Sequence, residues 1–245
     1  MQKGAKLAIA GTLLLVAVGA GEVAWIHHER NADVPEKKVE YKSDPDDLVF
    51  LKKERPDSLK DEKDLKGKNL WVSAGGQMDY YPYRGGKVDF TKSEGVLLGA
   101  EKLTVKDAVE QVAPKKTAIR IPTGDKQILL VFTKGTDAQE YATPVGYVEG
   151  GAAKIMTDEI FFYDDPHELY SYWGPQIWAA IDAHKAVAGM TEREAQMALG
   201  QVCTPHGDVP GNRPVDFYND GKPVTVTFSS GKATRIVEQT PEQKR

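Results

Sequence analysis

Cysteine is nearly absent from this chain of 245 residues, because Cys203 is the only one. A single cysteine excludes an intramolecular disulfide and any zinc site built from four cysteines. The chain is nevertheless long enough to bury a core without such support. Hydrophobic residues make up 40% of it and charged residues 28%, which excludes a fibrous or wholly disordered protein.

The chain also lacks an excess of positive charge. Its 36 acidic residues outnumber 32 basic ones, which leaves a formal net charge of −4. A surface of this sign repels phosphate backbones, so we expect no nucleic-acid partner. Glycine-rich loops that cradle phosphates are missing as well, since no pair of glycines is followed by a lysine and a helix. We therefore expect no cofactor.

A hydrophobic run stands near the N-terminus, where residues 7–21 carry no charge and follow Lys3 and Lys6. A helix from Leu7 to Ile26 would rise roughly 30 Å, about the thickness of the hydrocarbon core of a bilayer. Residues 1–28 thus predict a signal or transmembrane anchor, with the lysines inside and the body in the periplasm. The expected anchor residues include Leu7, Leu13, Leu14, Leu15, Val16 and Trp25.

Two other interpretations of this N-terminal run stay open. Val18, Gly19 and Ala20 form an acceptable small-residue cleavage site, and the protein would then be secreted after cleavage near Ala20. Alternatively, the run is a buried core helix. The uncleaved anchor and the cleaved signal peptide both export the body of the protein. Of all three interpretations, a single-pass protein of the inner membrane is the preferred one.

Residues 29–68 predict a charged linker, because 23 of these 40 residues are Asp, Glu, Lys or Arg. Such a stretch buries too little apolar surface to offset the entropy of ordering it, so we expect a solvated stalk. The exception is Asp47 to Leu51, which contains four consecutive apolar residues. That patch predicts a short helix or a segment that docks on the body. Ser58 and Leu59 predict a second short turn or helix.

Residues 69–163 predict a β-rich domain. Short extended runs alternate with glycine turns, which is typical of a small antiparallel barrel or sandwich. Gln127 to Phe132 predicts a buried strand, and Tyr141 to Val148 predicts another. Thr104 to Val112 differs from these runs, because Thr104 is placed to accept a hydrogen bond from the amide of Asp107. We expect a short helix there.

Residues 164–238 predict a unit in which helices precede strands. Asp165 and Pro166 supply an N-cap and a first-turn proline, and Thr191 with Glu194 forms a capping box. Three extended pieces follow, separated by tight hairpin signals. Residues 239–245 form a polar, frayed tail. The expected fold class is therefore α+β: a transmembrane helix, a stalk, a small antiparallel barrel or sandwich, and a helix–helix–three-stranded meander.

The string from Gly189 to Gly200 combines a Gly-Met-Thr turn, a two-turn helix and a terminal Leu-Gly. Together with the strand Val224 to Phe228 and the turn at Gly231, it resembles the SmpA/OmlA (BamE-like) family over residues 175–238. The resemblance implies a helix pair packed on one face of a sheet. It also implies an envelope protein that works by binding other proteins.

Aromatic side chains dominate both protein cores and binding surfaces. They gather in two groups here, one around Pro82 and one between Phe161 and Trp178. They either pack the barrel against the helices or form an exposed face that binds protein or glycan. The candidates for exposure are amphipathic and lie near turns: Tyr80, Tyr81, Tyr83, Tyr172 and Trp173.

The most reactive-looking string is Cys203 to Asp208, which holds a thiol, an imidazole and a carboxylate. These groups are the parts of a nucleophilic triad, and Cys203 with His206 is also a weak alternative for a soft metal site. An incidental cysteine and a solvated histidine in a loop are the simpler interpretation. We expect no catalytic residue and no metal.

These observations favour a non-enzymatic, membrane-anchored envelope protein that serves as a protein-binding adaptor or an assembly and scaffold factor. Envelope proteins and the lipid bilayer are the expected partners. One alternative is a module that binds peptidoglycan through its β-rich domain and its tyrosines. Another is a thiol hydrolase that uses Cys203.

Overall fold

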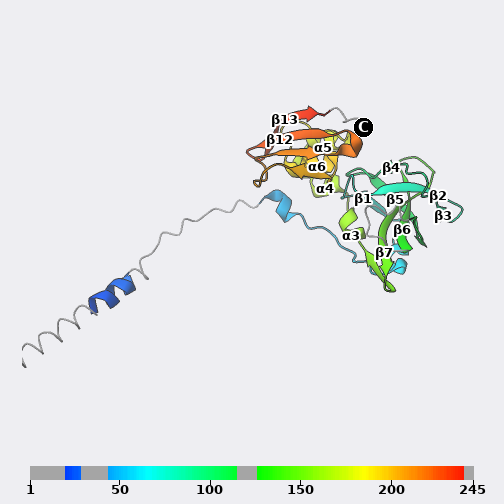
Figure 1. Ribbon diagram of the computed structural model, residues 1–245, viewed down its shortest axis with the longest axis horizontal. Helices are drawn as coiled ribbons and strands as arrows, with labels where there is room; N and C mark the ends of the chain where they lie inside the picture. The colour runs from blue at the N-terminus through cyan, green and yellow to red at the C-terminus, as the bar shows by residue number, and fades with distance from the viewer. Residues whose placement is uncertain (1–19, 29–43, 115–125, 240–245) are drawn as a thin grey trace, which may run out of the picture. The chain divides into compact units, whose positions relative to one another are not determined.

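The computed structural model of the chain describes residues 20–28, 44–114 and 126–239 (Figure 1). Residues 20–28 are helical. Close contacts divide the chain after Asp44, and the described residues from Pro45 onwards belong to one compact unit. This unit contains both β-sheets and every site discussed below.

The expected transmembrane helix is wrong for the part of the chain that the structure describes. No helix there is long and apolar enough to cross a membrane. Residues 20–28 rise only about 14 Å as a helix, roughly half of a hydrocarbon core. Residues 7–19, with Leu7, Leu13, Leu14, Leu15 and Val16, lie outside the described residues. The expected location in the cell envelope stays a prediction.

Nine strands of the described chain form a first, antiparallel sheet in the order β3-β2-β7-β6-β5-β1-β9, with β4 paired to β2 and β8 paired to β7 (Figure 1). Its central strand β6 is buried on both faces from Gln127 to Phe132. Ile128, Leu130 and Phe132 enter one apolar cluster, whereas Leu129 and Val131 enter another. The strand bounds are β1 Asn69–Val72, β2 Asp79–Arg84, β3 Lys87–Val88, β4 Gly95–Val96, β5 Lys102–Gln111, β6 Lys126–Lys134, β7 Tyr141–Glu149, β8 Ala152–Ile155 and β9 Phe161–Phe162.

The helix expected from Thr104 to Val112 is wrong, because these residues lie mainly in the long strand β5, which pairs with β6 along its length. Its buried residues are Leu103, Val105 and Ala108. The spacing between successive buried residues changes from two to three at a bulge between Val105 and Asp107. The extra residue in the bulge moves the side chains that follow it to the other face of the sheet. The bulge disguises the period-two pattern, so a local capping signal was mistaken for the start of a helix.

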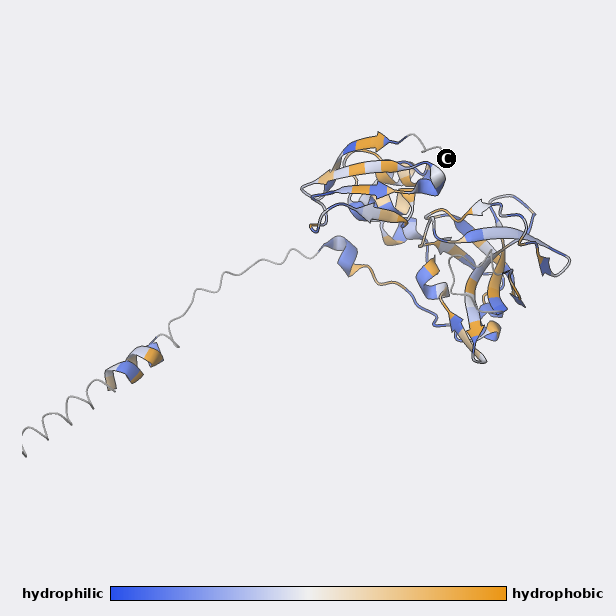
Figure 2. Ribbon diagram, in the orientation of Figure 1, coloured by the Kyte–Doolittle hydropathy of each residue, from blue (hydrophilic) through white to orange (hydrophobic). Residues whose placement is uncertain are grey.

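The C-terminal part is built from short helices and a second antiparallel sheet, which confirms the α+β class with antiparallel strands. The sheet follows the chain order β10-β11-β12-β13. Hydrophobic and polar residues alternate along β12 (Figure 2), where Val224, Val226 and Phe228 are buried. The bounds are α3 Thr157–Ile160, α4 Pro166–Leu169, η2 Ser171–Trp173, α5 Pro175–Asp182, α6 Glu192–Leu199, β10 Cys203–Pro205, β11 Pro214–Phe217, η3 Asn219–Gly221, β12 Val224–Ser229 and β13 Lys232–Glu238.

The two parts of the unit meet closely at glycines. A Cβ atom added to Gly99, between β4 and β5, would lie 2.1 Å from the carbonyl oxygen of Met197 in α6. The amide of Gln201 donates a 2.8 Å hydrogen bond to the carbonyl oxygen of Gly75. Phe162 of the first sheet belongs to the same apolar cluster as the C-terminal helices. Phe162 therefore packs the first sheet against the C-terminal helices, whereas most of the rest of the β-rich part has apolar clusters of its own.

The described residues of the expected stalk are not a solvated chain. Residues 45–48 form the 3-10 helix η1 (Pro45–Leu48), and Val49 and Leu51 pack against the C-terminal core. The helix α2 (Leu59–Lys63) follows, and its Glu62 is fully buried. The docking segment expected at Asp47 to Leu51 and the short helix expected at Ser58 and Leu59 are therefore confirmed, whereas the solvated stalk is wrong for these described residues. Residues 29–43 of the expected linker lie outside the described residues.

Candidate functional site

A stack of aromatic rings crosses the C-terminal part of the protein. The ring of Tyr170 stacks on Trp173 with centroids 4.5 Å apart, and Trp173 stacks on Trp178 at 5.3 Å. His167 lies 4.1 Å beyond Trp178. Three of these rings are almost entirely buried, so they form a rigid platform.

Local sequence signals build this platform. Asp165 caps α4 through the amide of His167, and Pro166 occupies the first turn. The 3-10 helix η2 then carries Tyr172 and Trp173, and Gly174, with φ of 82°, ends it. Glycine is needed there because other side chains rarely adopt this backbone conformation.

The imidazole of His167 is held between two carboxylates. Its Nδ1 lies 2.8 Å from Asp165 and its Nε2 lies 3.0 Å from Asp182. Burial lowers the pKa of His167, but the hydrogen bonds to both carboxylates outweigh it and raise the pKa above its ordinary value. The base of the aromatic stack is thus fixed by polar contacts.

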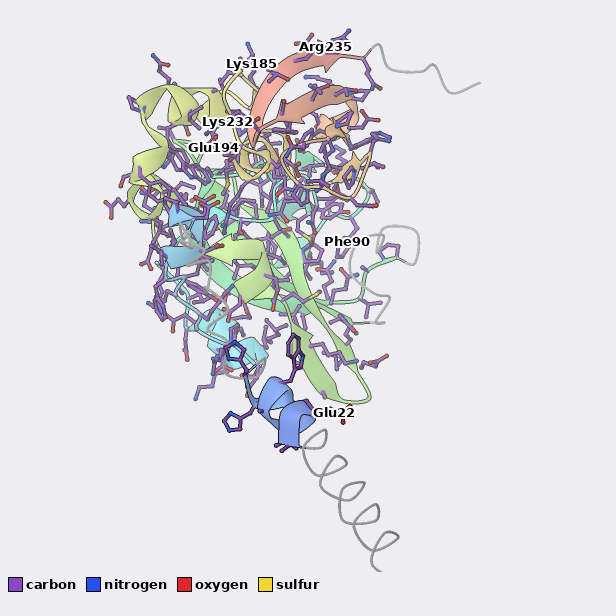
Figure 3. The ribbon with its side chains drawn as sticks, turned by 90° about the vertical axis from the view of Figure 1, so that its left-hand side faces the viewer. Glu22, Phe90, Lys185, Glu194, Lys232 and Arg235 are labelled. Atoms are coloured by element: carbon purple, nitrogen blue, oxygen red, sulfur yellow. The ribbon has the colours of Figure 1, made fainter. Side chains whose placement is uncertain are left out.

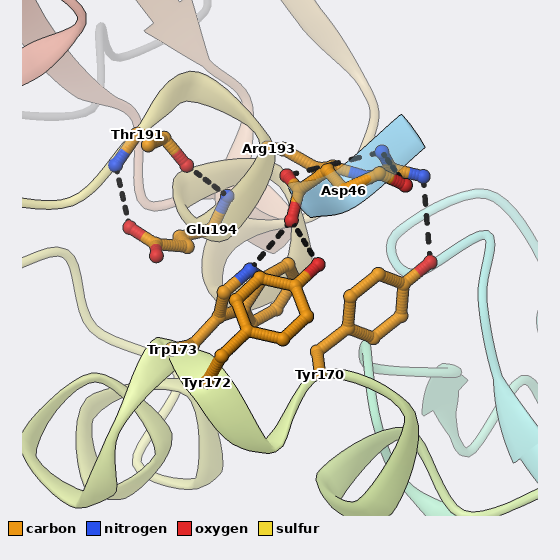
Figure 4. Close-up of polar contacts among 7 residues, drawn as sticks. All are labelled: Asp46, Tyr170, Tyr172, Trp173, Thr191, Arg193 and Glu194. Atoms are coloured by element: carbon orange, nitrogen blue, oxygen red, sulfur yellow. Dashed lines mark hydrogen bonds and ion pairs between the residues drawn. The ribbon is translucent and has the colours of Figure 1, made fainter. Parts of the chain in front are cut away.

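One carboxylate, that of Asp46 in η1, sits at the edge of this platform (Figure 4). Its Oδ1 accepts a hydrogen bond of 2.5 Å from the hydroxyl of Tyr172 and one of 2.8 Å from Nε1 of Trp173. The guanidinium of Arg193 lies 3.8 Å from its Oδ2. Aromatic donors and a cation therefore converge on a single carboxylate, and we call Tyr170, Tyr172, Trp173 and Arg193 the carboxylate clamp.

Arg193 is positioned by the first turn of α6. Thr191 caps that helix, its hydroxyl accepts from the amide of Glu194, and the Glu194 carboxylate accepts from the amide of Thr191, so the predicted capping box is confirmed (Figure 4). Nη2 of Arg193 donates to the hydroxyl of Tyr170 at 3.3 Å, and the guanidinium lies 5.4 Å from the centre of the Tyr170 ring. A cation over an aromatic face is favourable and limits where the guanidinium can move.

The clamp is partly shielded from water. The side chain of Asp46 is 11% exposed, whereas that of Arg193 is 43% exposed. Burial, the hydrogen bond to Asp46 and the charge of that carboxylate raise the pKa of Tyr172, so its hydroxyl stays a donor at any physiological pH. Hydrogen bonds to a charged group contribute about 1.5–3 kcal/mol each, and shielding strengthens them.

The segment that carries Asp46 is fixed at a second point. The backbone amides of Glu54 and Arg55 donate to the carboxylate of Asp158 at 3.3 and 3.1 Å, and the ammonium of Lys53 donates to the Asp158 carbonyl oxygen. Residues 45–55 thus run across the unit between the clamp and Asp158. We call them the strap.

Three of the five aromatic residues expected to be exposed are buried, and those expectations are wrong. Tyr80 and Tyr81 are 8% and 3% exposed because β2 is covered on both faces, and Trp173 is 8% exposed within the aromatic stack. Tyr83 is half-buried. Tyr172 is 47% exposed, as expected. Of the five candidates, only Tyr172 is largely exposed in the structure.

Cys203 and His206 are directed to different partners. Cys203 is half-buried beside Gln196, and burial, together with the charge of Glu192, raises the pKa of its thiol. His206 instead pairs with Asp216, its Nε2 lying 2.7 Å from Oδ2. Within residues 20–28, 44–114 and 126–239, no three His, Cys, Asp or Glu side chains are grouped so that they could hold a metal ion.

Two residues of the site, Asp46 and Arg193, were not predicted from the sequence. Asp46 was hidden within a run of charged residues, although the apolar stretch beside it was a signal for docking. Arg193 lies in a string whose glycines and capping residues indicated structure only. Comparisons with protein-family models, with curated proteins and with solved structures found no match for this chain.

Proposed function

We propose that the protein is a non-enzymatic adaptor that binds other proteins through the carboxylate clamp of its C-terminal part. The observation that carries the proposal is the capture of the Asp46 carboxylate by Tyr172, Trp173 and Arg193. Tyrosine, tryptophan and arginine are the residue types that dominate binding energy at protein interfaces. Their convergence on one carboxylate suits recognition of an acidic side chain on a peptide segment.

The alternatives have less support. A thiol hydrolase needs an accessible thiolate, and the raised pKa of Cys203 disfavours that form. A peptidoglycan-binding face was expected to use Tyr80 and Tyr81, and both are buried. An adaptor requires only a preformed surface, which the aromatic stack supplies.

The test is co-purification with a matched pair of variants of the full chain. Arg193→Ala removes the cation of the clamp. Arg235→Ala removes the same charge from an exposed position on β13, the edge strand of the second sheet (Figure 3). We expect stoichiometric partners with the wild type and with Arg235→Ala, and their loss with Arg193→Ala. Partners that survive Arg193→Ala unchanged, or a wild type that purifies alone, would refute the proposal.

A further inference from the structure

The strap is attached through few side chains. Leu48 and Phe50 are 72% and 89% exposed, so only Val49 and Leu51 bury apolar surface between the two fixed ends. The clamp itself is preformed, because the aromatic stack and the capping box do not involve the strap. Between the clamp and Asp158 the strap is held mainly by the Asp46 carboxylate and by the side chains of Val49 and Leu51, and the bonds to Asp158 are at exposed positions, so this part of the strap is exchangeable.

A space beside the strap remains unfilled. A pocket of about 230 Å³ lies between Leu51, the clamp and the first sheet. Phe162 and Met197 give it apolar walls, and Ser73, Gln196 and Gln201 add polar groups. Leucine is too short to fill this space. A tyrosine at the same place would put its ring against the apolar walls and its hydroxyl near the amides.

The contacts of the strap show how the side chains that bind this surface are spaced along the chain. Asp46 meets the clamp, Val49 follows three residues later and Leu51 five residues later, and the last two pack on the same apolar cluster. The charge is complementary as well, because Arg193 is the cation that faces the carboxylate.

We propose that the strap is an intramolecular competitor, and that the partner presents an extended segment with an aspartate followed three and five residues later by apolar side chains, the last one larger than leucine. This inference rests on the proposed adaptor function and names its partner chemistry. The partner displaces the strap because it fills the pocket that Leu51 leaves open.

Tethering explains why the competitor is effective. A segment of the same chain acts at an effective concentration in the millimolar range. A free copy of the strap therefore binds the intact protein weakly. Once Asp46 is replaced, the tethered segment loses its anchor and the clamp becomes available.

The experiment measures fluorescence anisotropy of a labelled peptide with the sequence of residues 44–53, DPDDLVFLKK. It is titrated with the full chain as wild type, as Asp46→Ala and as Asp46→Ala with Arg193→Ala. A second peptide carries asparagine in place of the aspartate that corresponds to Asp46, and a third carries tyrosine in place of Leu51. Circular dichroism on heating confirms that each variant unfolds cooperatively.

We expect Asp46→Ala to bind the first peptide at least about tenfold more tightly than the wild type does, because competition is removed. Adding Arg193→Ala, or using the asparagine peptide, should weaken binding about tenfold or more. The tyrosine peptide should bind more tightly than the leucine peptide. Equal affinity for wild type and Asp46→Ala would overturn the competitor, and a tyrosine peptide that binds no better would overturn the larger partner side chain.

The two proposals fail differently. If partners depend on Arg193 but no peptide binds Asp46→Ala, the adaptor function stands and the strap is not a mimic of the partner. If the peptide binds through Arg193 but no partner depends on that residue, the strap exchanges and the adaptor function falls.

Discussion

The indole nitrogen of Trp173 donates a 2.8 Å hydrogen bond to the carboxylate of Asp46, which lies 127 residues earlier in the chain. The indole is otherwise buried between Tyr170 and Trp178. Trp173 was expected to be exposed and to contact a partner. It is instead buried, and its indole N–H binds the strap. The attachment of the strap at the clamp depends on Asp46.

Replacing Asp46 should destabilise the protein measurably. Asp46→Ala removes the acceptor of two hydrogen bonds and leaves the Trp173 donor without it, which should cost about 1–3 kcal/mol of unfolding free energy. Urea denaturation followed by circular dichroism measures this loss. Asp47→Ala is the matched control, because Asp47 is the exposed neighbour in the same 3-10 helix and should cost little. Equal losses for the two variants would contradict the role assigned to Asp46.

The features that could be predicted from the sequence are those that depend on contacts between residues close together in the chain. The capping box joins residues three apart, and the cap of α4 joins residues two apart, so the residue types alone indicate them. The clamp joins residues 126 and 127 positions apart through Asp46. No pattern within one segment specifies such pairs, because tertiary packing decides which distant side chains meet.

The strand β5 shows a second reason why a prediction from the sequence was wrong. Thr104 had the chemistry of a helix cap, but its hydroxyl donates to the side chain of Asn69 on the neighbouring strand β1. Pairing of β5 with β6 runs from Leu103 to Gln111 and supplies backbone partners along that stretch. Long-range sheet formation therefore outweighed a local preference, as is common for short helical signals.

Glu62 makes the stability of the protein depend on pH. The side chain is fully buried, its Oε1 accepts from the hydroxyl of Thr157, and its Oε2 has no hydrogen-bond partner. Burial raises the pKa of Glu62 from 4.5 to about 7, and the nearby charges of Asp61 and Asp158 add to the rise. The folded state therefore binds a proton more tightly than the unfolded state does.

The sign of the effect follows from linkage. Below about pH 4.5 both states are protonated and Glu62 has no effect, whereas between about pH 4.5 and 7 the unfolded state ionises first and stability falls. The total loss is about 3 kcal/mol, and it is complete above about pH 7. Glu62→Gln stays neutral, so the variant should lack this part of the decline.

Urea denaturation at intervals between pH 4.5 and 8 tests the role of Glu62. Glu159→Gln is the control, because it removes an equal charge from an exposed position next to Asp158 and leaves Glu62 in place. We expect the control to keep the decline of the wild type. A Glu62→Gln variant with the same decline would assign the pH dependence to other groups.

Gly99 should tolerate no side chain. Its added Cβ would lie 2.1 Å from the carbonyl oxygen of Met197, which is backbone and cannot rotate away. Gly99→Ala should therefore force α6 from the first sheet and cost about 3 kcal/mol, as overpacking does. Thermal unfolding measures the loss. Gly21→Ala is the control, since a Cβ at Gly21 has no neighbour within 4 Å, and a drop of equal size there would contradict the steric explanation.

The thiol of Cys203 should react slowly. Its pKa is raised by burial and by the charge of Glu192, so less thiolate is present at neutral pH than in free cysteine. Alkylation by iodoacetamide at pH 7, followed by mass spectrometry, should be slower than that of a free cysteine, because less thiolate is present. The control is Thr234→Cys in a Cys203→Ser background, because Thr234 is exposed on β13 and its replacement should react like the free amino acid. A Cys203 that is alkylated faster than this control would restore the thiol hydrolase as a candidate function.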